Sequence, residues 1–319
     1  MAILVGIDEA GFGPILGPLV VSSSMFSMPD NLLNSDLWQL LRKSASNSRK
    51  HISGRLLIAD SKKAFIRSQG IKNIQRTVLA CLNCLEKNPS SLNDLLMLLC
   101  PNCCQRLKNY PWYKNTQDYS LSYDHADLSI ASEVFKDNLI SNDIKLLELK
   151  SYCLDVAYYN KMVNTVRNKA NVLFSATSML IKHAFDNFDD DQIQVIIDRQ
   201  GGRIHYRKKL LTMFENMDLK IIQQTPNNSS YELQANGKKM RLHFVVKADN
   251  RFLPVSLASM VSKYLRELLI DNINHYFRNF HSDLKPTAGY WKDGLRFIQD
   301  IKKHLPHLNY NADQLIRSR

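Results

Sequence analysis

The stretch Ile3–Gly13, ILVGIDEAGFG, carries an apolar run that leads two adjacent carboxylates, Asp8 and Glu9, into a glycine turn. The apolar run predicts a buried strand. Adjacent acids at the end of such a strand repel each other unless a cation joins them. Carboxylate oxygens favour Mg²⁺ or Mn²⁺ over zinc, and these ions commonly act on phosphate esters. The stretch therefore predicts the start of a metal site; the alternative is that Asp8 only caps the turn.

Two later segments repeat this arrangement. Val195–Ile197 ends at Asp198, before a turn that contains Gly201 and Gly202. Asp249 follows the apolar run that begins at Phe244. Because buried strands can bring the residues at their ends to one edge of a sheet, we expect these acids to meet. Each Asp could instead only start its turn.

The bulk composition indicates a folded protein with a polyanionic partner. The chain has 319 residues, 45% of them hydrophobic, with 42 Lys and Arg against 30 Asp and Glu, a net charge of +12. This charge suggests nucleic acid or an anionic membrane surface. No apolar stretch reaches the roughly 18–20 residues that a membrane span needs. The segment before Asp8 is too short for a signal peptide.

Positive charge is concentrated between Gly201 and Arg251. Ten cations stand against four acids, Glu215, Asp218, Glu232 and Asp249; the cations are Arg203, Arg207, Lys208, Lys209, Lys220, Lys238, Lys239, Arg241, Lys247 and Arg251. The stretch could follow a phosphate backbone. It could equally be an ordinary solvated surface.

The apolar pattern predicts an α/β fold in which strands and helices are interspersed. Expected strands are 3–7, 19–26, 195–197, 231–233 and 241–246, and the last two form a hairpin around Asn236-Gly237. Expected helices are 71–85, 159–185, 255–280 and 293–304.

The helix expected after Pro254 carries a polar stripe. Ser256, Ser259, Lys263 and Arg266 are three or four residues apart, which places them on one face. Two hydroxyls and two cations are suited to holding phosphates. The alternative is an ordinary solvent-facing surface.

Four segments form a set of motifs along the chain. The first is Gly6–Val21, GIDEAGFGPILGPLVV, and the second is Asp60-Ser61-Lys62-Lys63. The third is Lys247-Ala248-Asp249 with the helix opening that follows, and the fourth is Gly289-Tyr290. Together, and in this order from residue 1 to about 295, they resemble the motifs of the type 2 ribonuclease H (ribonuclease HII) family.

The resemblance implies a ribonuclease H-like fold, a central mixed sheet flanked by helices, and two divalent ions held by Asp8, Glu9, Asp198 and Asp249. It implies hydrolysis of the RNA strand of an RNA/DNA hybrid, or at a ribonucleotide embedded in DNA, leaving a 5′-phosphate. One ion would activate water and the other would stabilise the leaving oxygen. The implied nucleic-acid contacts are Gly11, Phe12, Gly13, Ser61, Lys62, Lys63, Lys247, Ser256, Ser259, Lys263, Arg266 and Tyr290.

The chain departs from the family in two respects. Phe12 stands where the family usually has Arg in Gly-Arg-Gly, a loop whose backbone recognises the ribose 2′-hydroxyl. Recognition of a single embedded ribonucleotide is therefore in question. The chain is also longer. We expect a core at 1–66 and 146–319, a mostly helical insertion at 67–145, and a basic hairpin extension at about 201–246.

The cysteines allow two interpretations. Cys81, Cys84, Cys100 and Cys103 have the spacing of a zinc ribbon. However, Cys81 and Cys84 lie in an apolar helical stretch, and free Cys is often buried, so packing is favoured over structural zinc. A disulfide framework is not expected in a chain of this size, and a reducing cytoplasm is the expected location.

Other residue types indicate less. His205 and His243 flank the basic extension but are isolated. Tyr110, Trp112 and Tyr113 could stack on a base or pack under a loop.

Three functions follow. The leading hypothesis is a metal-dependent endoribonuclease. A non-catalytic nucleic-acid-binding protein and a nuclease for DNA or structured RNA are the alternatives.

Overall fold

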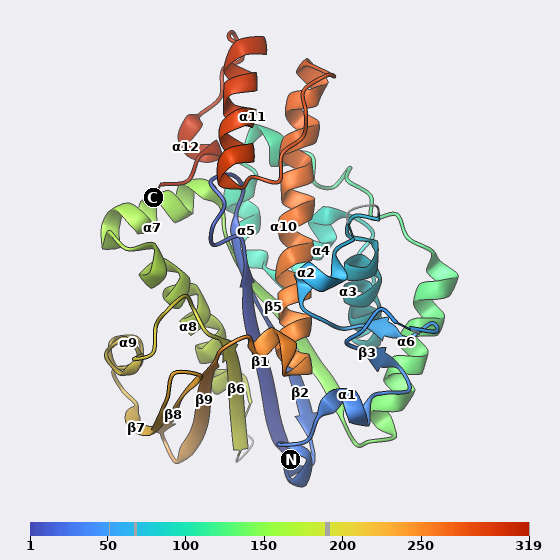
Figure 1. The fold of residues 1–319 in the computed structure, drawn as a ribbon, viewed down its shortest axis with the longest axis vertical. Helices are drawn as coiled ribbons and strands as arrows, with labels where there is room; N and C mark the ends of the chain where they lie inside the picture. Colours follow the sequence, from blue (N-terminus) through green and yellow to red (C-terminus); the bar gives the residue numbers. More distant parts are fainter. Residues whose placement is uncertain (51, 67–68, 189–191, 319) are drawn as a thin grey trace.

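A seven-stranded mixed sheet forms the centre of the protein in the computed structural model, which describes residues 1–50, 52–66, 69–188 and 192–318 (Figure 1). The strand order is β5-β2-β1-β6-β9-β8-β7. The bounds are β1 Ala2–Ala10, β2 Leu19–Met28, β5 Lys145–Leu154, β6 Gln192–Asp198, β7 Asp218–Gln224, β8 Asn228–Ala235 and β9 Lys238–Val245. A short parallel pair, β3 (Ala45–Ser46) and β4 (Leu56–Leu57), lies outside this sheet.

The directions of the strands explain where the acids gather. β1 is antiparallel to β2, and β2 is antiparallel to β5. On its other side β1 is parallel to β6, and β6 is parallel to β9. The carboxyl ends of β1, β6 and β9 therefore meet at one edge of the sheet. This confirms the expected α/β class with a central mixed sheet.

Helices cover both faces of the sheet. α10 (Leu253–Phe280) crosses β1 and β2 on one face. Gly6 of β1 permits this approach, since a Cβ there would lie 2.2 Å from the backbone of Pro254. On the other face lie α7 (Val156–Val166), α8 (Lys169–Asn187) and α9 (Arg207–Met213). Further elements are α1 (Leu37–Leu40), α2 (Ser61–Ala64), α11 (Trp291–His304), α12 (Ala312–Leu315) and the 3-10 turns η1 (Asp30–Leu32), η2 (Pro111–Tyr113) and η3 (Ala248–Asn250).

The segment expected to be an insertion is mostly helical. It contains α3 (Lys72–Cys84), α4 (Leu92–Leu99), α5 (Pro101–Leu107) and α6 (His125–Ile140). Its buried side chains belong to the same hydrophobic cluster as those of α10. The segment therefore shares a core with the sheet domain instead of enclosing a core of its own. The expected boundary at residue 67 lies outside the described residues.

Several expected elements are confirmed. The strands at 3–7, 19–26 and 195–197 are β1, β2 and β6, and the hairpin is β8–β9, with φ of +53° at Asn236 and +78° at Gly237. The single helix expected at 159–185 is wrong. Arg167 has φ +48° and ends α7, and the side chain of Asn168 then caps α8. None of the helices in the described ranges is long and apolar enough to span a membrane.

Candidate active site

The structure brings Asp8, Glu9, Asp198 and Asp249 together at the edge where β1, β6 and β9 end. Asp8 and Glu9 lie near the end of β1, and Asp198 is the last residue of β6. Asp249 lies on η3, which follows β9. These carboxylates are close enough for each to experience the charge of others. Residues up to 241 positions apart in the chain thus share one electrostatic environment.

Burial and mutual repulsion disfavour the charged forms of the first two acids. Asp8 is 6% exposed, and its burial, followed by repulsion from Glu9 and Asp198, raises its pKa well above the usual value. Burial and repulsion from Asp198 raise the pKa of Glu9 to about 7. A hydrogen bond from Ser259 opposes the shift at Asp8.

The two other acids are perturbed in the same direction. Burial raises the pKa of Asp198 to about 6, although the amide of Ala248 donates to Asp198 Oδ1 over 2.7 Å. Burial and the charge of Asp60 raise the pKa of Asp249. Clustered carboxylates with raised pKa values are typical of functional sites.

Lys62 and Asp60 add charge on the α2 side of the cluster. The ammonium of Lys62 favours the charged forms of Glu9, Asp198 and Asp249. Asp60 caps α2 by accepting from Lys62 N at 2.9 Å. With Asp249 it lines a cavity of about 150 Å³. Asp60 was not among the expected site residues, although it directly precedes three that were.

The donor set matches the chemistry of a hard divalent cation. Four carboxylates that repel one another, with oxygen as the donor atom, suit Mg²⁺ or Mn²⁺. In the ranges that the structure describes, no group of three or more His, Cys, Asp or Glu side chains is already arranged to hold a metal ion. Ligand identity therefore fits such an ion, and binding would require side-chain adjustment.

The serines of α10 position the acids. Ser262 Oγ donates to the backbone oxygen of Asp8 over 3.0 Å. Ser259 Oγ lies 3.1 Å from the hydroxyl of Ser61, and both serines are buried. Ser256 is fully buried and donates to the backbone oxygen of Asp249. The expectation that Ser256 contacts phosphate is thus corrected, because its face of the helix packs against the sheet.

Arg266 is the largest departure from the expected phosphate-binding stripe. It is 1% exposed, and its Nη2 donates to the backbone oxygens of Leu16 at 3.2 Å and Ala288 at 3.0 Å. The guanidinium lies 5.7 Å from the ring centroid of Tyr290. Arg266 therefore fastens two loops to α10 from beneath and is not available to a phosphate.

The three remaining lysines of the expected nucleic-acid surface, Lys63, Lys247 and Lys263, lie nearer the solvent. Lys263 pairs with Glu267 over 2.7 Å, which partly neutralises it. Lys247 is exposed, with a left-handed φ of +52°, immediately before η3. Lys63 is exposed and donates to the side chain of Asn250.

The glycine loop lies against Arg266. Gly11 has φ +93°, and a Cβ there would lie 2.6 Å from Arg266 Nε. Phe12 is half-buried, and Gly13 is exposed with open space around it. Lys169 Nζ, from the first turn of α8, lies 5.3 Å from the centroid of the Phe12 ring. Lys169 thus brings a cation to this loop, and its distance in sequence explains why it was not anticipated.

Two further segments hold the loop in place. The oxygen of Gly289 accepts from Ile15 N at 2.9 Å and from Leu16 N at 3.2 Å, and the adjacent Tyr290 is 50% exposed. From the other side, Arg317 N donates to Ile15 O at 2.8 Å, and Leu16 forms a β-bridge with Ile316.

The cysteines expected as a possible zinc set lie in two groups. Cys84 Sγ is 3.3 Å from Ser132 Oγ, next to Cys81 in α3. Cys100 and Cys103 lie 3.4 Å apart at their sulfurs, near Cys104 and Cys153. All six cysteines are free thiols. This arrangement supports packing as the role of Cys81 and Cys84.

The aromatic group Tyr110, Trp112 and Tyr113 is 2–4% exposed and packs together in the core. Stacking on a base is therefore wrong for these rings as they stand. His205 is exposed, and His243 lies on β9, facing a cavity that is described below.

Comparisons with known proteins give similarity at the level of structure. No protein-family model and no curated sequence matches the chain. The complex of PCNA and RNase HII from Archaeoglobus fulgidus matches with a TM-score of 0.47 and 14% identity over 99% of this chain and 94% of that chain. Ribonuclease H2 from Pyrococcus horikoshii OT3 has a TM-score of 0.42 and 13% identity over 99% and 92%. Bst-RNase HIII in complex with Mn²⁺ has 0.47 and 12% over 99% and 66%.

Proposed function

We propose that this chain is a divergent type 2 ribonuclease H, a divalent-metal-dependent endoribonuclease that hydrolyses the RNA strand of RNA/DNA hybrids and leaves a 5′-phosphate. One observation carries the proposal: Asp8, Glu9, Asp198 and Asp249 converge beside a glycine loop, where burial and the charges of neighbouring carboxylates raise their pKa values. Sequence motifs that resemble the family contain Asp8, Glu9 and Asp249, and Asp198 stands at a strand end outside them.

The proposed cofactors are two Mg²⁺ or Mn²⁺ ions, held by Asp8, Glu9, Asp198 and Asp249. When bound, such ions supply an activated water and stabilise the leaving oxygen. The protein itself fixes the positions of the carboxylates through hydrogen bonds. Ser262 fixes the backbone of Asp8, and the Ala248 amide orients Asp198.

Cations near the acids would hold the substrate. Lys62 is exposed and already faces three of the carboxylates, so its ammonium can also meet a phosphate that enters the site. On the opposite side the Gly11 loop offers backbone groups to a ribose, and the half-exposed ring of Tyr290 offers a surface for stacking. We propose nucleic acid as the partner and the cytoplasm as the location.

The loop supports a second candidate, a nuclease of the same chemistry that prefers DNA or structured RNA. Phe12 replaces the arginine of the family's Gly-Arg-Gly loop, and the loss of its guanidinium weakens the contact with phosphate. Lys169, from α8, brings a positive charge back to this loop, because its ammonium lies 5.3 Å from the centroid of the Phe12 ring. The substrate preference can therefore differ from that of the family, while the carboxylates keep their proposed role in metal-dependent cleavage.

The decisive experiment compares wild type, Asp8→Asn and Asp218→Asn on four labelled substrates with Mg²⁺ or Mn²⁺. The substrates are an RNA/DNA hybrid, a duplex with one ribonucleotide, duplex DNA and single-stranded RNA. Asp218→Asn is the matched control because Asp218 is exposed on β7. We expect hybrid cleavage by wild type and control, and a loss of roughly a hundredfold or more in Asp8→Asn.

Each other outcome has a definite meaning. Equal cleavage by Asp8→Asn would refute the proposed role of the carboxylates. Metal-dependent cleavage of duplex DNA or single-stranded RNA in place of the hybrid would favour the second candidate. Tight binding of the hybrid without cleavage of any substrate would instead support a non-catalytic nucleic-acid-binding protein.

A further inference from the structure

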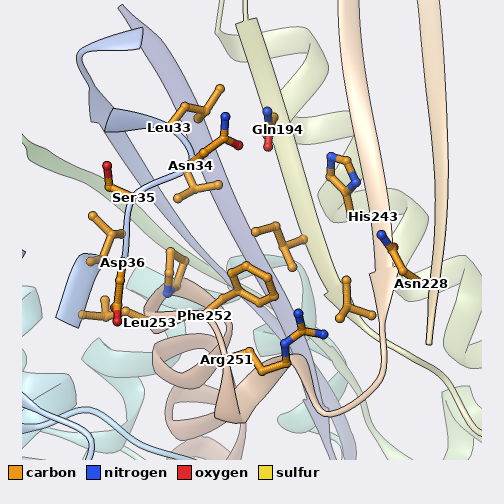
Figure 2. A pocket seen from close by; sticks show the side chains of 15 residues that line it. Leu33, Asn34, Ser35, Asp36, Gln194, Asn228, His243, Arg251, Phe252 and Leu253 are labelled. Atoms are coloured by element: carbon orange, nitrogen blue, oxygen red, sulfur yellow. The ribbon is translucent and has the colours of Figure 1, made fainter. Parts of the chain in front are cut away.

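A cavity of about 380 Å³ lies on the face of the sheet that carries Asp8 and Asp198, beside the start of α10 (Figure 2). Gln194 and Ile196 of β6 line it, and Asp198 follows them with the same side-chain direction, because alternate residues of a strand share a face. The segment Leu33–Leu37 closes the opposite side. This volume is in the range of small-molecule sites in proteins.

The cavity combines apolar walls with a few polar groups. Its apolar surface comes from Leu4, Leu33, Leu37, Ile196, Val245, Phe252, Leu253 and Pro254. Figure 2 shows Gln194, His243 and Asn228 along the strands on one side, with Arg251 and Phe252 at the end nearest α10. Apolar walls with a small number of convergent polar groups are typical of sites that bind a small molecule.

His243 presents an acceptor that lacks a protein partner. Ser230 Oγ lies 3.2 Å from Asn228 Oδ1 and 2.9 Å from His243 Nδ1; when the hydroxyl donates to Asn228, its oxygen accepts from His243 Nδ1–H. The other ring nitrogen, Nε2, then carries a lone pair, and it is buried without a hydrogen bond from the protein. Burial and the charge of Arg241 lower the pKa of His243, which keeps the ring neutral. A ligand N–H or O–H would relieve the cost of this buried acceptor.

Arg251 supplies a positive charge at the mouth of the cavity. Its side chain is exposed, and its guanidinium lies 5.4 Å from the centroid of the Phe252 ring. The acid in the lining, Asp36, is engaged elsewhere, because it caps α1 by accepting from Trp38 N at 2.9 Å. The guanidinium is thus placed to bind an anion that reaches the cavity from solvent.

We propose that this cavity binds a nucleotide unit. A planar base would lie between the apolar walls and donate an N–H to His243 Nε2, and its phosphate would pair with Arg251. The unit could be a free nucleoside monophosphate or the terminal nucleotide of a strand that crosses the neighbouring carboxylates; the recognition chemistry is the same. The proposal rests on the cavity and is independent of whether the carboxylates cleave a hybrid.

The test is a calorimetric titration of the whole protein with AMP, with adenosine and ribose 5-phosphate as partial ligands. We expect saturable AMP binding and at least tenfold weaker binding of either partial ligand. His243→Phe keeps a ring of similar size and removes the acceptor, and Arg251→Ala removes the charge. Each should weaken AMP binding about tenfold. Arg278→Ala, exposed at the far end of α10, is the matched control and should bind as wild type does.

A parallel arm with a short single-stranded oligoadenylate identifies the source of the nucleotide. Tighter binding of the oligonucleotide than of AMP, lost in the same two variants, would identify a strand end, whereas equal affinity would identify the free nucleotide. The proposal is overturned if AMP gives no saturable heat, or if Arg251→Ala and the control bind AMP equally. Because Arg251 is at the surface, that variant keeps the test valid even if His243→Phe does not fold.

Discussion

Glu9 and Asp198 lie where charge is costly, so the protein without divalent cations should lose stability as pH rises. Their folded-state pKa values, about 7 and about 6, exceed the ordinary values of 4.5 and 3.8. At pH values between the ordinary pKa and the folded-state pKa of each group, the folded state binds more protons than the unfolded state. Protonation of Glu9 and Asp198 therefore favours the folded state. This contribution to stability is complete below about pH 4 and is lost as the pH rises to about 7.

Glu9→Gln should remove part of this loss. With a chelator present at pH 8, we expect the variant to be more stable than wild type by roughly 3 kcal/mol, because the pKa of Glu9 is raised from 4.5 to about 7 and each pKa unit corresponds to about 1.4 kcal/mol. The difference should shrink towards pH 4.5. Urea denaturation at both pH values measures it, and a difference that does not change with pH would contradict the prediction.

Lys169 should serve as the cation of the glycine loop. Its ammonium lies 5.3 Å from the ring of Phe12 and is exposed to solvent. Lys169→Met should weaken binding to an RNA/DNA hybrid about threefold to tenfold and lower the salt dependence by about one ion. Fluorescence anisotropy at several salt concentrations measures both. Lys161→Met, an exposed lysine on α7, is the control, and an equal effect of the two variants would show that only net charge matters.

The sequence alone predicts the carboxylates of the site, but it does not predict the roles of several residues that surround them. Acids at the ends of apolar runs are visible in the sequence, because strand ends share an edge. The spacing of Ser256 and Arg266 shows that they share a helix face, but not that this face packs against the sheet. Lys169 was not anticipated because contact with Phe12 depends on how α8 packs.

α10 connects the elements around the site through Arg266. A single buried guanidinium holds backbone oxygens of the loop after β1 and of the loop before α11. Both hydrogen bonds come from Nη2, which lies one bond farther from Cα than the Nζ of a lysine would, so a lysine at this position does not reach both loops in the same way.

Arg266→Lys should therefore destabilise the protein. We expect a loss of about 2–3 kcal/mol from the broken hydrogen bonds and the carbonyls left unpaired. Thermal and urea denaturation measure the change. Arg278→Lys, exposed on the same helix, should have little effect, and similar losses in both variants would show that Arg266 does not fasten the loops.

Helices and strands with a clear apolar period or turn signal could be predicted from the sequence. The residues at which they end were harder to predict. The hairpin at Asn236-Gly237 follows from local turn preferences. The end of α7 at Arg167 does not, because Arg seldom adopts the left-handed conformation and the apolar period continues across the break. β5 was not expected, since Lys, Glu and Ser interrupt its apolar residues.

Considered as a whole, the molecule combines a net charge of +12 with a concentrated group of acids. A divalent cation that binds only the folded state should stabilise it, by about 2.7 kcal/mol at a hundred times the dissociation constant. We therefore expect Mg²⁺ or Mn²⁺ to raise the melting temperature by several degrees at pH 8. Asp249→Asn should abolish the increase and Asp218→Asn should keep it. An increase of equal size in Asp249→Asn would place the ion elsewhere.

The class of fold was predictable at this scale, and the packing of residues 67–145 was not. Alternating strands and helices indicate an α/β protein. Whether added helices form a separate unit depends on which apolar faces meet, and here they join the cluster around α10.

The pairing of the early loop with the tail has a consequence for biosynthesis. Pro14 and Arg317, which contact each other, are separated by 303 positions. A ribosome exposes the acidic turn long before it makes the residues that fasten that turn. A translation product that stops before Leu315 would contain the sheet and its acids. The loop beside the acids would then lack Ile316 and Arg317, one of the two segments that hold it in place.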